Sequence, residues 1–143
     1  MNERESQQNP ADLDKLKQCI QDGNNAADAA LGLEPQMVKD APRSFDPKGA
    51  TDDQLRLYQE FIKPFESARS YKAAMAIQSS RLAEMEGRKD DAAKFKGQAD
   101  QLRQSYSELG DLDKKIQQEI DDRAAAKQAA ESGNKNSNTN STK

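Results

Sequence analysis

The chain has 143 residues, of which 34% are hydrophobic and 33% are charged, with a net charge of −3. A typical soluble domain has roughly 45–50% apolar and about 25% charged residues, so this composition excludes a large globular core. The 22 basic and 25 acidic residues are interleaved, which is typical of a solvated surface and argues against a nucleic-acid-binding protein. An extended helical hairpin needs only one apolar stripe per helix, so the composition favours an all-α, coiled-coil-like fold.

The sequence contains no apolar run that approaches the ~20 residues of a membrane-spanning helix. The first residues, MNERESQQNPADLDK, lack the hydrophobic region of a secretory signal. Cys19 is the only cysteine, which excludes an internal disulfide and suits a reducing compartment. We therefore expect a protein without membrane contact, in the cytoplasm or within a virion or other assembly there.

The N-terminal part is expected to hold short helices. Residues 1–8 are polar and predict disorder, whereas residues 9–33 predict two short helices. The first has Pro10 at its first position and Gly23 as a left-handed stop. Its apolar face includes Cys19, so we expect a buried structural thiol there.

Residues 34–50 contain three prolines and predict a linker or an extended arm. Two arrangements are open, a free linker and an arm packed along a helix. The apolar side chains of Met37, Val38 and Phe45 favour the packed arm.

Residues 51–130 predict a long antiparallel hairpin of two helices. Thr51 and Gln54 match a capping box at the start of the first helix, and Gly87 ends it. Because both helices rise equally per residue, facing residues should have numbers that sum to about 177. This register pairs apolar residues throughout. The predicted hairpin core comprises Phe61, Phe65, Tyr71, Met75, Leu82, Phe95, Leu102, Tyr106, Leu109, Leu112 and Ile116.

Two irregularities fall at one level of the predicted hairpin. Pro64 removes a backbone donor from the first helix, and Gly110 weakens the second by about 1 kcal/mol relative to alanine. They either form a shared bend or break their helices separately. Beyond the hairpin, residues 131–143 are low-complexity and polar, which predicts a disordered tail.

The sequence offers little chemistry for catalysis. It has no histidine, the commonest general base and metal ligand, and no phosphate-binding or nucleophile motif. Its acidic pairs are adjacent or nearly so on helices, where neighbouring side chains point about 100° apart and do not converge on one ion. We therefore expect no enzyme activity, no metal site and no cofactor.

The start of the first long helix is apolar around more than half of its circumference, which a two-helix hairpin cannot bury. Four candidates could cover this apolar surface: the N-terminal helix, the proline-rich arm, a second copy of the chain or a foreign protein. The residues predicted to bind a partner are Leu55, Leu57, Tyr58 and Ile62.

These features favour a non-enzymatic protein that binds other proteins through helix faces, as a structural, scaffolding or adaptor subunit. Its partner is another protein or a second copy of itself. The alternative is a dedicated chaperone or inhibitor that masks one partner. A third hypothesis, a nucleic-acid accessory protein, would depend on the mildly basic tail.

Overall fold

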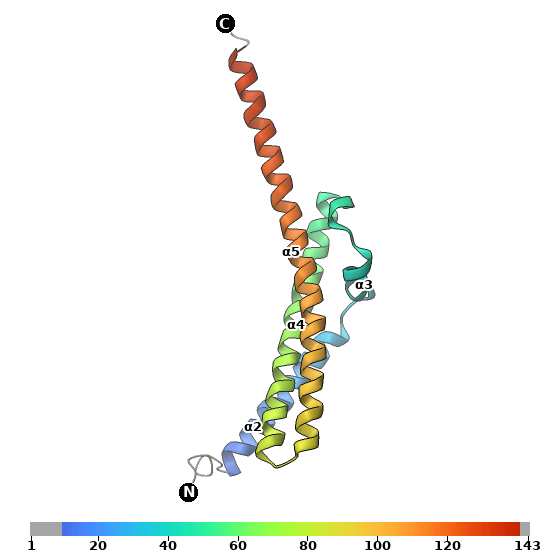
Figure 1. Cartoon of the computed structure of the whole chain (residues 1–143), viewed down its shortest axis with the longest axis vertical. Coiled ribbons are helices and arrows are strands. Elements are labelled where there is room, and N and C mark those ends of the chain that lie inside the picture. Colours follow the sequence, from blue (N-terminus) through green and yellow to red (C-terminus); the bar gives the residue numbers. More distant parts are fainter. Residues whose placement is uncertain (1–9, 141–143) are drawn as a thin grey trace.

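The structure, a computed structural model, describes residues 10–140, with side chains described for residues 10–133. Within residues 10–140, four α-helices and one 3₁₀ helix follow in chain order: α2 (Pro10–Gly32), α3 (Gln36–Ser44), η1 (Pro47–Gly49), α4 (Asp52–Met85) and α5 (Lys89–Asn140). Figure 1 shows α4 and α5 as an antiparallel rod, with α2 and α3 along its sides and the end of α5 projecting beyond them. The predicted all-α hairpin is confirmed.

Local sequence signals set both ends of α4. At its start, the Thr51 Oγ1 accepts from the Gln54 N–H at 3.2 Å, and the Gln54 Oε1 accepts from the Thr51 N–H at 2.9 Å. This reciprocal pair is the predicted capping box. At its end, Gly87 has a φ of 74°, a left-handed conformation that glycine adopts without steric cost. The Arg88 N–H then bonds back to the Ala83 carbonyl at 2.8 Å.

The α4 side of the hairpin core follows a strict seven-residue repeat of buried positions, which keeps one face against a partner helix. This row consists of Leu55, Ile62, Arg69, Ala76 and Ala83. The facing positions of α5 include Ala92, Ala99, Leu109, Leu112 and Ile116, all buried. Small side chains dominate toward the turn, and the large aliphatic ones lie toward the other end, where the arm joins the core.

The predicted hairpin core is therefore wrong at three positions, where aromatic side chains remain exposed. Phe61 and Tyr71 are 42% and 48% exposed, and Tyr106 on α5 is 37% exposed. Sequence reasoning placed the largest apolar residues between the two helices, but alanine and serine allow closer packing there. The other predicted core residues are buried, namely Leu82, Leu109, Leu112 and Ile116, or half-buried, namely Phe65, Met75, Phe95 and Leu102.

The N-terminal segment forms one continuous helix instead of two short ones, because Gly23 does not end α2. Gly23 lies where α2 crosses α4: a Cβ built on it would come within 2.5 Å of the Met75 Sδ and 3.0 Å of the Tyr71 Oη. The glycine thus permits close approach of two helices. Lys17 pairs with Glu86 near the hairpin turn, whereas Glu34, which follows α2, pairs with Arg69, so α2 runs antiparallel to α4.

Polar contacts flank a narrow apolar stripe between α2 and α4. The Lys72 ammonium donates to the Asn24 Oδ1 at 2.8 Å and lies 2.9 Å from the Asp28 carboxylate. The buried α2 residues are Ile20, Gly23 and Ala27. Cys19 is exposed, which corrects the predicted buried thiol, because the contact stripe of α2 is narrow and leaves position 19 outside it.

Residues 34–50 form a packed arm that includes α3 and η1, so the free linker is wrong. Val38 and Ala41 are fully buried in the same core cluster as Ile62 and Leu109. The ring of Phe45 stacks on Tyr58, with 3.8 Å between centroids. The sequence missed α3 because Pro42 reads as a helix breaker. Pro42 lies inside α3 and costs it one backbone hydrogen bond, yet the helix forms with Val38 and Ala41 buried.

Arg123 fastens the arm to α5. Its guanidinium donates to the Ala50 carbonyl at 2.7 Å and to the Asp52 carboxylate at 2.8 Å. Its Nε donates to Glu119 at 3.0 Å. One side chain therefore joins α5, the end of the arm and the start of α4.

Neither irregularity interrupts its helix. α4 is continuous across Pro64, and α5 is continuous across Gly110, so the alternative of two separate helix breaks is wrong. The backbone of α5 is helical to Asn140, which differs from the predicted disorder over residues 131–140. Residues 1–9 and 141–143, on which the remaining predictions of disorder fall, lie outside the described residues.

Candidate functional site

The four residues predicted to bind a partner are separated by the fold. Leu55 and Ile62 are fully buried in the core cluster, so they are not accessible to a partner and that assignment is corrected. Tyr58 is half-buried under Phe45. Leu57 remains 47% exposed. The arm and α5 cover most of this apolar helix start, which is the intramolecular alternative.

An apolar row on the outer face of α4 is covered at one end only. Phe61, Ala68, Met75 and Leu82 follow one another at seven-residue intervals and so lie on one side of the helix. Gly23 of α2 packs on Met75, and Leu82 is buried. The face is open at the other end, where Phe61 and its helical neighbour Leu57 stay exposed. We call Leu57 and Phe61 the α4 docking face.

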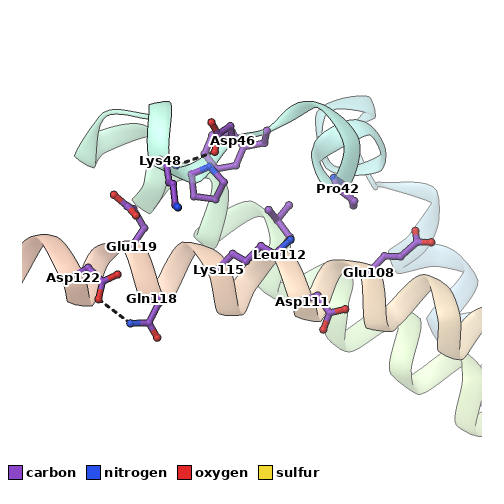
Figure 2. Close-up of a pocket in the computed structure, with 12 residues that line it drawn as sticks. Pro42, Asp46, Lys48, Glu108, Asp111, Leu112, Lys115, Gln118, Glu119 and Asp122 are labelled. Atoms are coloured by element: carbon purple, nitrogen blue, oxygen red, sulfur yellow. Dashed lines mark hydrogen bonds between the residues drawn. The ribbon is translucent and has the colours of Figure 1, made fainter.

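A second surface is a groove of about 690 Å³ between the arm and α5. Figure 2 shows Asp46 and Lys48 on the arm above a row of side chains from α5. Its apolar residues are Pro42, Phe45, Pro47 and Leu112. Its charged residues are Asp46, Lys48, Glu108, Asp111, Lys115, Glu119 and Asp122. We call this surface the arm groove.

Sequence reasoning missed the arm groove, although one signal was present. Glu108, Asp111, Lys115, Gln118 and Asp122 are three or four residues apart, which places them on one face of α5. The other wall could not be found in this way, because the groove exists only through the packing of α3 and η1 against α5.

An acidic contact crosses the hairpin beside Gly110. Partial burial, followed by the nearby Asp113 carboxylate, raises the pKa of Glu66 above its usual value. The folded chain therefore holds this proton more tightly than the unfolded chain does. Stability associated with Glu66 is highest below the unfolded pKa and is lost as pH rises through the folded pKa.

Because the pKa of Glu66 is raised in the folded chain, removing its negative charge should stabilise the fold. Glu66→Gln should raise the Tm at pH 7 relative to the wild type, and this difference in Tm should shrink on acidification toward pH ~4.5. Differential scanning calorimetry over that pH range measures both changes. Glu60→Gln, at an exposed position of the same helix, is the matched control. A lower Tm for Glu66→Gln at pH 7 would contradict the assigned repulsion.

Metal binding and membrane crossing were considered for the described part of the chain. Within residues 10–140 there is no group of three or more histidine, cysteine, aspartate or glutamate residues that could hold a metal ion. None of the helices in that range combines the length and the hydropathy that crossing a membrane requires.

Comparison with known proteins leaves these two surfaces as the basis for any assignment. No protein-family model, curated protein or solved structure matches the chain. The function must therefore be argued from the α4 docking face and the arm groove themselves.

Proposed function

We propose that this chain is a non-enzymatic helical protein that binds other proteins, as a structural, scaffolding or adaptor subunit of a larger assembly. The observation that carries the proposal is the α4 docking face. The row of residues that receives α2 at Met75 continues to Phe61, where α2 no longer covers it. A further helix laid in line with α2 would bury Phe61 and Leu57, which is how helix-in-groove recognition uses apolar residues.

The shape of the chain supports the same role. It exposes 10317 Å², whereas a compact protein of its mass of 15.9 kDa would expose roughly 7,400 Å². The rod-like α4–α5 hairpin (Figure 1) gives a short chain an extended surface for partners. The exposed single thiol of Cys19 supports a reducing compartment such as the cytoplasm.

The test combines mass measurement with site-specific crosslinking. The full chain is run on a size-exclusion column with light scattering over a range of loading concentrations. Replacing Phe61 with a photo-crosslinking phenylalanine derivative then captures whatever lies on the α4 docking face in cell extract. Leu33, which is 79% exposed outside α4, is the matched position for a control crosslinker and for Leu33→Ser.

We expect a dimer that is lost in the Leu57→Ser/Phe61→Ser variant and kept in Leu33→Ser, or a discrete adduct that forms from the crosslinker at position 61. The adduct should be lost when Leu57→Ser is added, and it should not form from the crosslinker at position 33. A dimer that dissociates on dilution would identify the first partner as a second copy. A stable monomer that forms one adduct in a fixed ratio would favour the chaperone or inhibitor instead. No dimer and no adduct specific to position 61 would refute the proposal.

A further inference from the structure

The arm groove is a preformed concavity and not a gap beside a loose segment. Arg123 fixes the end of the arm through the Ala50 carbonyl and Asp52. The stack of Phe45 on Tyr58 fixes its middle, and buried Val38 fixes α3. The volume of about 690 Å³ lies within the range of roughly 300–1,000 Å³ that is usual for ligand sites.

The charge of the groove is strongly one-sided. It is lined by five carboxylates and two lysines, which gives a net charge of −3, equal to the net charge of the whole chain. The end of α3 carries Pro42 beside the groove, and the C-terminal end of a helix adds further negative potential.

Two of the five carboxylates are not used within the described part of the fold. Glu119 pairs with Arg123, Asp122 accepts from the Gln118 amide at 2.8 Å, and Asp46 accepts from the Lys48 N–H at 3.1 Å. Glu108 and Asp111 are exposed and form no ion pair or side-chain hydrogen bond in the part of the chain that the structure describes. The lysines do not neutralise the site, because three carboxylates remain in excess.

We propose that the arm groove docks a basic segment of a partner protein, with lysine or arginine side chains facing Glu108 and Asp111 and one apolar side chain against Pro42 and Phe45. Charge complementarity selects the basic side chains. Cationic side chains alone would leave the apolar residues of the groove without an apolar partner, so the docked segment should also carry one apolar anchor. The inference rests on the proposed role in protein binding, but it uses a surface separate from the α4 docking face.

The chain's own C-terminal segment is the competing occupant. Residues 124–143 contain three lysines and one glutamate, so a second copy could offer positive charge to the groove. The segment has no leucine, isoleucine, valine, methionine or aromatic residue to serve as an anchor. A foreign basic segment with an anchor therefore fits the groove better.

The test uses a fluorescein-labelled peptide, GKKSLSKKG, and measures its binding to the full chain by fluorescence anisotropy at physiological ionic strength. Two control peptides replace the central leucine by serine or all lysines by glutamate. The double variant Glu108→Lys/Asp111→Lys reverses two charges in the groove. The matched variant Glu60→Lys/Glu84→Lys reverses two exposed charges on α4, and circular dichroism checks that both variants fold.

We expect the groove variant to bind GKKSLSKKG at least tenfold more weakly than the wild type, with the matched variant changed less than about twofold. The serine and glutamate peptides should bind more weakly than GKKSLSKKG. Absence of binding, equal loss in both variants, or equal binding of the serine peptide would overturn the inference. Self-association that only the groove variant loses would overturn it in favour of the C-terminal segment.

The same measurements separate this inference from the proposed function. The Leu57→Ser/Phe61→Ser variant should bind the peptide as the wild type does, because neither residue lines the groove. Loss of peptide binding in that variant would count against a separate groove site. Failure of the peptide alone, with position-61 adducts retained, would refute the groove and leave the proposed function standing.

Discussion

Replacing Ile62 with alanine should lower the free energy of unfolding by about 2–5 kcal/mol. Ile62 is fully buried in the cluster where α3, α4 and α5 meet. Removing its side-chain atoms therefore leaves a cavity that the surrounding helices cannot fill by shifting. Urea denaturation followed by circular dichroism measures the change. The slope of the transition should stay constant if the variant keeps the native fold.

The neighbouring Phe61 supplies the matched control. Its side chain is larger, but it is 42% exposed, so Phe61→Ala should cost less than about 1 kcal/mol. The two variants together test the hairpin register. If Phe61→Ala were the more destabilising one, α4 would pack with the face that the sequence pattern first suggested.

Replacing Arg69 with methionine should destabilise the fold by about 3–5 kcal/mol, because it leaves a buried carboxylate without its partner. The Arg69 Nη2 lies 2.6 Å from the Glu34 Oε1, and the two side chains are only 10% and 7% exposed. The Arg69 Nη1 also donates to the Ser105 carbonyl at 2.9 Å. Chemical denaturation measures the loss.

A double variant separates the ion pair from side-chain packing. Arg69→Met/Glu34→Met removes both charges and keeps similar volumes, so it should recover at least half of the stability lost in Arg69→Met. Hydrogen exchange should show faster opening of the end of α2 in the single variant, because Glu34 joins that end to the hairpin. Equal stability of the single and double variants would show that Glu34 reaches solvent once Arg69 is removed.

Much of the hairpin could be predicted from local patterns. Thr51 and Gln54 cap the start of α4 as their spacing indicates, and Gly87 ends that helix region with a positive φ. The three-and-four spacing from Ala92 to Ile116 also predicts the buried face of α5, with Tyr106 as the exception. Each of these features depends on residues within a few positions of one another, which is the range over which sequence patterns act.

The contacts that position α2 and the arm on the hairpin could not be predicted in the same way. Arg69 occupies a core position of α4, which no hydrophobic pattern selects, and it is satisfied by Glu34 from a distant segment. Gly23 reads as a helix stop until Met75 and Tyr71 are placed against it. Burial of such residues depends on partners far away in the sequence, and periodicity carries no information about them.

The sequence by itself therefore determined the class of the protein: helical, poor in core residues and built on one long hairpin. Capping, turn geometry and helical periodicity are local and act through the backbone of neighbouring residues. Only the tertiary structure decided which faces are buried, because α2 and the arm cover part of the apolar surface of the hairpin and leave the rest exposed to solvent. As a result, Ile62 is buried and Phe61 is exposed, although the two residues are adjacent in the chain.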